Sequence, residues 1–251
     1  MRMGAYYDQY WRERLAQKQR WDSIRTRRLK FVLARIRPGV RVLDYGCGTG
    51  DFVAPMQRAG AEVYGVDVSD VALSVARKKA PRAHYRLLTA EESLPFSDGE
   101  FDCVIAMEVV EHVFDLQSLF RELNRVSKPG GTLLVSCPYH GVVKNVLISL
   151  LWFEEHFNPD SAHIRFYTVR SLTRVLNRHG FGVRRVVRFG WFWPVYRVML
   201  LEAVKYRAGD AIGAMQAEGP LKGLARRLLR YCDRFVKSHQ SASRRQVASE
   251  D

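Results

Sequence analysis

Cysteine is scarce in this chain of 251 residues, and its four thiols form no CxxC pair. They are Cys47, Cys103, Cys137 and Cys232. This spacing argues against a disulfide framework or a zinc site and favours a reducing compartment. The longest apolar run, Val146 to Phe153, is far shorter than the roughly 20 residues that span a bilayer. The first residues also lack the apolar core of a secretory signal, so we expect a cytoplasmic protein.

Acidic residues are also few, with 26 Asp and Glu against 40 Lys and Arg, which gives a formal net charge of +14. The middle of the chain runs against this trend, because residues 42–164 carry 10 basic and 17 acidic side chains. The basic excess therefore lies on the two flanks. Such flanks favour an anionic partner, namely a membrane, a nucleic acid or an acidic substrate. A soluble enzyme with arginine-rich helices is the alternative that stays open.

Short apolar strands alternate with helices, which indicates an α/β fold with a doubly wound, mostly parallel sheet. The predicted strands are 40–45, 62–66, 84–88, 101–106, 132–136, 182–188 and 198–204. The predicted helices are 8–36, 51–59, 70–79, 116–126 and 168–180, with a turn at 128–131. The basic N-terminal helix precedes the first strand, and an insertion follows the fifth.

The chain divides into two parts of unequal size. Residues 1–207 are predicted to form one domain, with its core at 40–137 and an acceptor-side insertion at 138–167. Residues 208–251 are predicted to contain a basic amphipathic helix, because apolar positions from Leu221 to Phe235 recur at helical spacing between arginines. The last polar residues are predicted to be disordered.

The sequence VLDYGCGTGDF, residues 42–52, lies between a strand and a helix, as a nucleotide-binding glycine turn requires. Gly46, Gly48 and Gly50 let the backbone approach a ligand closely. Asp51 stands where the dinucleotide motif GxGxxG has its last glycine, so that motif fails. S-adenosylmethionine has no pyrophosphate, and its ammonium group needs an acceptor, which Asp44 supplies. The turn therefore favours S-adenosylmethionine.

Asp67 ends the next strand, with Val68 beside it. A carboxylate in this place accepts both ribose hydroxyls of a nucleoside. The alternative is that Asp67 caps the following helix. Ser69 and Asp70 already offer caps, so the ribose role is favoured.

The run LLTAEESLPFSDGEFDCVIAMEVVEHV, residues 87–113, completes a resemblance to class I S-adenosylmethionine-dependent methyltransferases of the small-molecule group. The resemblance covers about residues 40–137 and extends more weakly to about 204. It implies a seven-stranded sheet whose last strand is antiparallel. It also implies that Ala90 and Glu91 meet the adenine, and that Met107 lines the cofactor.

Met107 is followed by a cluster that is similar to the ExxEH motif of ubiquinone-biosynthesis O-methyltransferases, which is linked to a divalent cation in that group. Here the motif comprises Glu108, Glu111 and His112, which would share one face of a helical turn. They are predicted to be catalytic, with His112 as general base, or alternatively to bind a divalent cation. An ordinary acidic helix start is the remaining interpretation. Arg28 falls where the ubiquinone group has a cofactor-binding arginine.

The predicted reaction is O-methylation of a small-molecule, lipid-linked or glycan-precursor hydroxyl. Tyr139, His140, His156 and His163 are candidates to line the acceptor pocket. RNA methylation is an alternative that the basic charge suits, although nucleic acid is less favoured as a partner. A non-catalytic S-adenosylmethionine-binding module is disfavoured by the intact glycine turn. The sequence carries no signal for an oligomeric state.

Membrane contact is a further expectation. The run Val146 to Phe153, the aromatic residues Trp191 and Trp193, and the basic tail helix suit peripheral binding to an anionic inner membrane face. Ordinary core packing of the run is the alternative.

Overall fold

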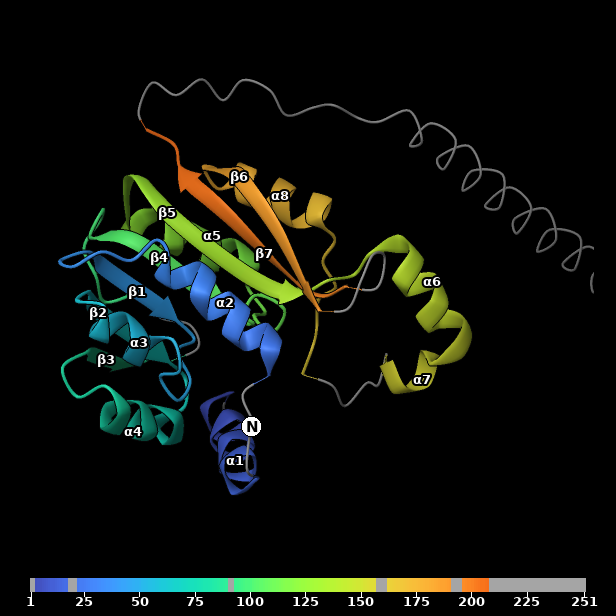
Figure 1. The fold of residues 1–251 in the computed structure, drawn as a ribbon, viewed down its shortest axis with the longest axis horizontal. Helices are drawn as coiled ribbons and strands as arrows, with labels where there is room; N and C mark the ends of the chain where they lie inside the picture. The colour runs from blue at the N-terminus through green and yellow to red at the C-terminus, as the bar shows by residue number, and fades with distance from the viewer. Residues whose placement is uncertain (1–2, 18–21, 90–92, 157–161, 191–195, 208–251) are drawn as a thin grey trace, which may run out of the picture. The chain divides into compact units, whose positions relative to one another are not determined.

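The computed structural model describes residues 3–17, 22–89, 93–156, 162–190 and 196–207, in which one sheet carries helices on both faces (Figure 1). The strands are β1 Arg41–Tyr45, β2 Glu62–Asp67, β3 His84–Leu87, β4 Phe101–Met107, β5 Ser127–Pro138, β6 Phe181–Gly190 and β7 Tyr196–Lys205. The helices are α1 Met3–Ala16, α2 Ser23–Leu33, α3 Val53–Arg58, α4 Asp70–Lys79, α5 Leu116–Val126, α6 Val142–Leu151, α7 Phe153–His156 and α8 Val169–Arg178.

The seven strands lie in the order β3-β2-β1-β4-β5-β7-β6. Strands β1 to β5 pair in parallel, and β7 pairs antiparallel with both β5 and β6. The chain order reverses between β1 and β4, and the carboxyl ends of these two strands flank the point where ligands bind in open α/β sheets. The predicted seven-stranded, mostly parallel sheet is confirmed.

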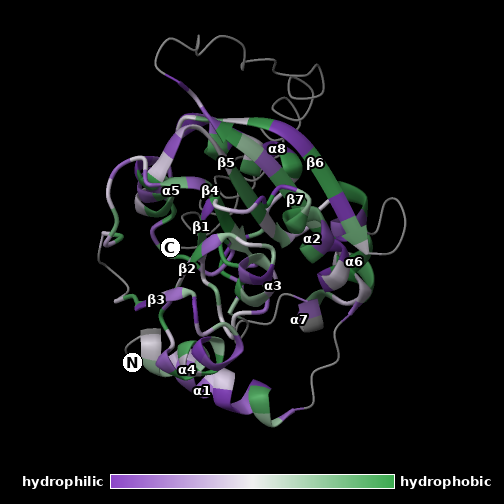
Figure 2. Ribbon diagram, turned by 60° about the vertical axis from the view of Figure 1, so that its left-hand side comes forward, coloured by the Kyte–Doolittle hydropathy of each residue, from purple (hydrophilic) through white to green (hydrophobic). Residues whose placement is uncertain are grey.

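Two apolar clusters lie on opposite faces of the sheet. One contains residues of α2, α3 and α4, and the other contains residues of α5 and α8. Figure 1 shows α2 and α3 in front of the strands, with α5 and α8 behind them. Figure 2 shows hydrophobic colour in the central strands between these layers. Burial on both faces explains why these strands read as apolar runs in the sequence.

Side-chain caps fix where several helices begin. Ser69 caps α4 by accepting a hydrogen bond from Ala72 N at 3.2 Å, and Thr168 caps α8 in a capping box with Ser171. These caps satisfy backbone N–H groups that have no partner within the helix. The helix starts predicted at Ser69 or Asp70 and at Thr168 are confirmed.

The single helix predicted over residues 8–36 is wrong. The structure has two helices there, α1 and α2, and Asp22 caps the second by accepting from Arg25 N at 2.6 Å. Asp22 adopts an extended backbone conformation, so the helical path cannot pass through it. The apolar spacing was similar on both sides of this cap, which made the two helices look like one.

Strand β5 begins at Ser127, although a turn was predicted over 128–131. Ser127 pairs with Phe101, and pairing resumes only at Thr132 with Cys103. Gly130, with φ of +79°, lies in the interrupted stretch. The turn residues therefore form an irregularity within the strand.

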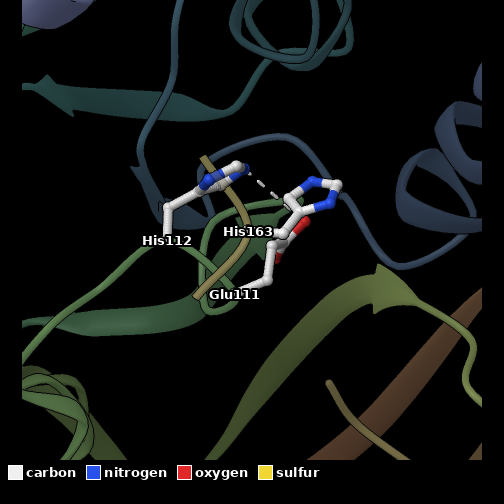
Figure 3. A group of neighbouring side chains, drawn as sticks. All are labelled: Glu111, His112 and His163. Carbon is white, nitrogen blue, oxygen red and sulfur yellow. Dashed lines mark ion pairs between the residues drawn. The ribbon is translucent and has the colours of Figure 1, made fainter. Parts of the chain in front are cut away.

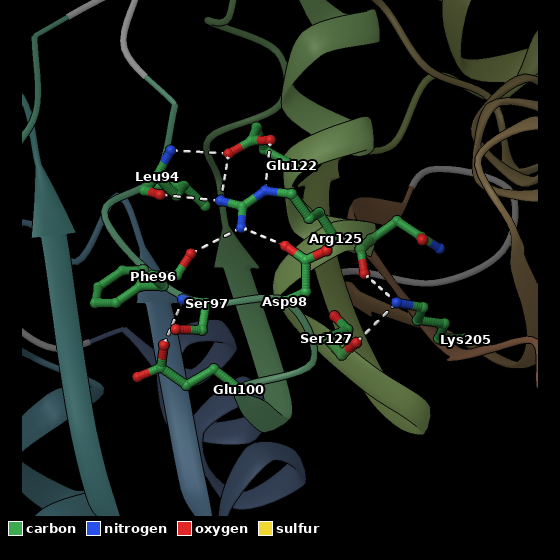
Figure 4. A network of polar contacts seen from close by, with 10 residues as sticks. Leu94, Phe96, Ser97, Asp98, Glu100, Glu122, Arg125, Ser127 and Lys205 are labelled. Atoms are coloured by element: carbon green, nitrogen blue, oxygen red, sulfur yellow. Dashed lines mark hydrogen bonds and ion pairs between the residues drawn. The ribbon is translucent and has the colours of Figure 1, made fainter.

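Arg125 of α5 fastens the segment that leads into β4 (Figure 4). Its guanidinium donates to the carbonyls of Leu94 and Phe96 at 2.9 and 2.7 Å, and it pairs with Glu122 and Asp98 at 2.8 Å each. The carboxylate of Glu122 also accepts from Leu94 N at 2.8 Å. This network holds the segment between β3 and β4 against the C-terminal end of α5, beside the edge where β1 and β4 begin.

Several predicted features lie outside the described residues. They are Ala90, Glu91, Trp191, Trp193 and the whole tail from 208 to 251. Within the described part, no helix is long and apolar enough to cross a membrane.

Candidate active site

The glycine turn follows β1 at the carboxyl edge of the sheet. Gly46, Gly48 and Gly50 all have positive φ, at +73°, +51° and +75°. A side chain at Gly46 would also collide with Val109, since an added Cβ would lie 2.5 Å from its Cγ2. Both backbone conformation and space therefore require glycine here.

Cys47 lies within this turn and is buried, as is Cys103 in β4. Burial raises the pKa of both thiols. A buried, protonated thiol is a poor nucleophile, so neither residue is suited to nucleophilic catalysis.

Asp44, near the end of β1, has a buried carboxyl group without a cationic partner among the described residues. Only 2% of the residue is exposed, and its Oδ2 has no hydrogen-bond partner in the described structure. Burial raises its pKa well above the usual value, and Asp67 and Asp51 add to this effect. A bound ammonium group would supply the missing charge and donor, so this residue fits the S-adenosylmethionine prediction.

Asp67 ends β2 across the turn from Asp44. Its Oδ2 accepts from Gly48 N at 2.8 Å, and its Oδ1 accepts from Ser69 N at 3.0 Å. Ser69 is the cap of α4, so the alternative of Asp67 as the cap does not hold. Each carboxylate oxygen keeps a further lone pair, and these fit ribose hydroxyls. Val68 is half-buried beside it.

Met107 is the last residue of β4, and Glu108, which follows it, has a different environment. Met107 is buried in the core cluster that includes α2. Glu108 has φ of +58°, the one positive value among the described non-glycine residues. Its Oε1 accepts from Ser136 Oγ at 2.9 Å and pairs with Arg28 Nη1 at 3.0 Å. Arg28 reaches this point from the buried face of α2, and its Nε is buried without a partner in the described residues.

The helical turn predicted for the ExxEH segment is wrong. Residues 108–112 form a bend and a hydrogen-bonded turn, and α5 begins only at Leu116. The carboxylate of Glu108 pairs with Arg28, although it is still close enough to Glu111 to help raise the pKa of that residue. The acidic helix start that was weighed as an alternative is excluded for the same reason.

His163 joins Glu111 and His112 in place of Glu108 (Figure 3). One donor atom from each residue lies within 4.8 Å of the other two. The backbone fixes this arrangement, because Ile164 N donates to Glu111 O at 3.0 Å. Sequence spacing alone placed His163 in the acceptor-side insertion but did not pair it with the motif.

The surroundings of Glu111 and His112 both favour the uncharged forms of these side chains. Glu111 is 1% exposed, its two carboxylate oxygens have no hydrogen-bond partner in the described structure, and burial raises its pKa well above the usual value. Burial lowers the pKa of His112. The Nδ1 of His112 lies 2.8 Å from the carbonyl of Ala162, which only accepts, so Nδ1 carries the proton. The lone pair is then on Nε2, which lies 3.8 Å from Glu111 Oε1.

Two other predicted acceptor residues lie at the start of the insertion. His140 is buried, its ring centre is 5.6 Å from that of His156, and burial lowers its pKa to about 4. Tyr139 forms an isolated parallel β-bridge with Tyr167, just before α8. These contacts anchor the insertion to the sheet near the Glu111–His112 pair.

Comparison with known proteins identifies the family of this chain. A family model described as a methyltransferase domain matches residues 10–186, well over half of the chain. The chain belongs to this family. It is a class I methyltransferase, and S-adenosylmethionine is the cofactor of that class. Both the resemblance seen in the motifs and the predicted cofactor are thereby confirmed.

Curated relatives of this methyltransferase match about half of its chain. A ubiquinone biosynthesis O-methyltransferase of Xanthomonas campestris pv. campestris is 40% identical over 114 residues, which cover 43% of this chain and 48% of that protein. The mitochondrial ubiquinone biosynthesis O-methyltransferase of Homo sapiens is 31% identical over 160 residues, covering 59% and 43%. The matched region thus spans less than half of the length of these relatives.

Solved structures share the fold of this methyltransferase. Magnesium protoporphyrin IX methyltransferase from Synechocystis PCC 6803, solved with bound S-adenosylhomocysteine, superposes with a TM-score of 0.63 at 22% identity. That match covers 80% of this chain and 97% of the other. An S-adenosylmethionine-dependent methyltransferase from Mesorhizobium loti gives 0.57 at 20% identity, covering 71% and 96%.

The sequence did not single out every residue of the site. No recognisable motif marked Ser136, which donates to Glu108, or Trp11 of α1, which lies against Gly48 in the glycine turn. The aromatic cluster YYDQYW at residues 6–11 was the available signal for α1.

Proposed function

We propose that this methyltransferase transfers a methyl group to a hydroxyl of a small-molecule, lipid-linked or glycan-precursor acceptor. The observation that carries the proposal is the position of His112, whose Nδ1 lies 2.8 Å from the carbonyl of Ala162, so that Nε2 is left to accept a proton. The names of the curated relatives support oxygen as the methylated atom. Methyl transfer to a hydroxyl releases a proton, so such a base is needed beside the acceptor.

The residues of the chain divide the work of this reaction. When bound, S-adenosylmethionine supplies a methyl group that is already activated by its sulfonium. Asp44 accepts the ammonium group and Asp67 accepts the ribose hydroxyls, which fixes the cofactor. His112 Nε2 removes the hydroxyl proton, which leaves an imidazolium whose Nδ1–H still donates to the carbonyl of Ala162. Positioning supplies most of the rate.

A divalent cation is the second form of this proposal. Glu111, His112 and His163 offer one carboxylate and two imidazoles, a donor set that suits transition metals. A cation there would displace the Glu111 proton and orient the acceptor oxygen, acting as a Lewis acid. His112 Nε2 cannot serve as metal ligand and base together, so the two forms make different predictions.

Peripheral contact with an anionic membrane is proposed for delivery of an apolar acceptor. Helix α6 has no buried residue, and its rows 142/146/150 and 143/147/151 expose valine and leucine side chains. Trp152 and Phe153 extend this surface at 56% and 58% exposure. Exposed Arg188 lies over the Tyr139 ring at 5.5 Å, just before α6. Apolar residues beside cations suit a lipid surface better than open solvent.

The test combines methyl-labelled S-adenosylmethionine with small phenols, sugars, lipid extracts and RNA as acceptors. With the acceptor that is labelled, His112→Ala should lower turnover by about 10²–10⁴-fold if His112 is the base. Affinity for S-adenosylhomocysteine should stay close to that of the parent. Restoration of activity by manganese or zinc after chelation, together with its loss in Glu111→Ala and His163→Ala, would favour the cation form. Labelling of RNA alone would contradict the proposed acceptor class.

A further inference from the structure

Helix α1 packs directly on the glycine turn. The Trp11 ring lies so close to Gly48 that an added Cβ would be 2.7 Å from its Cζ2. At the start of the helix, an added Cβ at Gly4 would lie 3.0 Å from the carbonyl oxygen of Val68. Glycine at 48 is therefore required by the approach of α1, in addition to its positive φ.

Asp8 fastens α1 to the strand end that carries the predicted ribose acceptor. Its Oδ1 accepts from Ser69 Oγ at 2.6 Å and from Val71 N at 3.2 Å. The Ser69 hydrogen bond is the main reason why the pKa of Asp8 is lowered. Ser69 itself donates to Asp67, so Asp8 and Asp67 are linked through one serine.

Tyr7 brings α1 to the proposed base. Its ring lies edge-on to that of His112, with centres 6.4 Å apart. Burial raises the pKa of Tyr7 to about 12, and Tyr6, Asp67 and Glu111 add to the shift. The phenolic hydroxyl makes no hydrogen bond within the described residues. Tyr7 is half-buried and lies near both Asp67, the proposed ribose acceptor, and Glu111.

We propose that α1 is the outer wall of the S-adenosylmethionine site, with Trp11 and Tyr7 contacting the cofactor and Asp8 holding the wall in place. The proposal rests on the assigned cofactor and adds binding residues to it. Small-molecule sites bury most of their ligand's surface, and the glycine turn covers one side only. Aromatic side chains on the facing helix supply the other side and exclude water from the methyl group.

The experiment measures release of tritiated S-adenosylhomocysteine from the full chain during a chase with unlabelled ligand. Asp8→Ala should speed release by about tenfold or more, as expected when hydrogen bonds to a charged group are lost. Trp11→Ala and Tyr7→Ala should each speed release by about tenfold through lost aromatic contact. Matched controls are Asp70→Ala, an exposed carboxylate at the start of α4, and Trp152→Ala, an exposed aromatic residue outside α1. Both controls should release ligand at the parent rate.

The outcomes separate a cofactor wall from simple packing. Unchanged release in Asp8→Ala and Trp11→Ala would overturn the proposal, even if their melting temperatures fall. Tighter binding in Trp11→Ala would also overturn it, because α1 would then obstruct the site. A parent protein that binds no S-adenosylhomocysteine would refute the assigned cofactor, whereas normal binding with insensitive variants would refute the wall alone.

Discussion

The two buried carboxyl groups that are proposed to bind the cofactor, Asp44 and Asp67, differ in how the protein holds them. Asp67 accepts from two backbone N–H groups, whereas the Oδ2 of Asp44 has no partner in the described structure. The first residue is ready to receive hydroxyl donors with little rearrangement. The second is an unpaired acid until a cation arrives, so binding of an ammonium group there offsets a cost already present in the free protein.

Replacing Asp67 tests the ribose assignment. Asp67→Ala should weaken S-adenosylhomocysteine binding by about 1.5–3 kcal/mol, or roughly 10–100-fold, because a charged acceptor of hydroxyl groups is lost. Isothermal calorimetry measures the effect. Asp70→Ala, which removes an exposed carboxylate three residues away, should bind like the parent. Equal affinity in Asp67→Ala would refute the ribose role.

The positions of the proposed cofactor residues were easier to predict from the sequence than those of the proposed acceptor residues. Asp44, the glycines and Asp67 lie at strand ends that hydrophobic patterning locates, and parallel strands end at one edge. His163 lies 51 positions after His112, and only tertiary contacts of the returning insertion bring the two together. No periodicity carries that information. Glu108 was grouped with Glu111 on helical spacing, and a positive φ at Glu108 removed the basis for that grouping.

At the scale of the elements, the exposed apolar face of α6 is not explained by packing within the described fold. A helix on the surface of a globular domain normally buries one apolar stripe. Helix α6 buries none of its residues and carries Lys144 as its one charged side chain. Lys144 is turned inward, donating to the carbonyl of Tyr139 at 2.8 Å. The outward rows are therefore left apolar.

Charges on α6 should abolish the proposed lipid contact. The double variant Val146→Glu and Leu150→Glu places acids at positions that are 53% and 75% exposed. Its partitioning onto anionic vesicles at low salt should fall more than tenfold, because each lost apolar insertion is worth about 1.5–3 kcal/mol. Co-sedimentation measures it. Leu87→Glu, at a 50% exposed leucine of β3, should partition like the parent. A parent protein that stays in the supernatant contradicts membrane contact.

The elements of the core were more predictable than those at its flanks. Helix α5 has the predicted bounds, because its apolar spacing and the Asp115 cap agree. The strands are right to within a few residues, except at the start of β5. The flanking helices α1 and α2 were merged, since the apolar spacing was similar on both sides of the Asp22 cap. That cap is a local polar contact, and the pattern of hydrophobic residues does not record it.

At the scale of the whole molecule, Asp44 should make folding depend on pH. Its pKa is raised in the folded state, so the folded chain holds a proton that the unfolded chain releases from about pH 4 upward. The stabilising contribution present at low pH is lost as pH rises. Asp44→Asn cannot ionise, so relative to the parent it should gain stability between pH 5 and 8, as measured by urea unfolding without cofactor. The same variant should bind S-adenosylhomocysteine more weakly.

An opposite result would have a clear meaning. If the difference in stability between Asp44→Asn and the parent stays constant with pH, Asp44 is ionised in the folded protein and some cation already compensates it. If the variant binds S-adenosylhomocysteine as well as the parent does, Asp44 is not the ammonium acceptor.

The buried thiol of Cys47 in the glycine turn can report how often the cofactor site opens. Cys47 is buried within the glycine turn itself. Cys103 and Cys137 are buried in strands β4 and β5 of the sheet. Alkylation followed by peptide mass spectrometry should modify Cys47 at the rate of local opening and the two strand cysteines at the slower rate of global unfolding. S-adenosylhomocysteine should slow the first rate selectively. Equal rates at all three thiols would mean that the turn opens only when the whole sheet does.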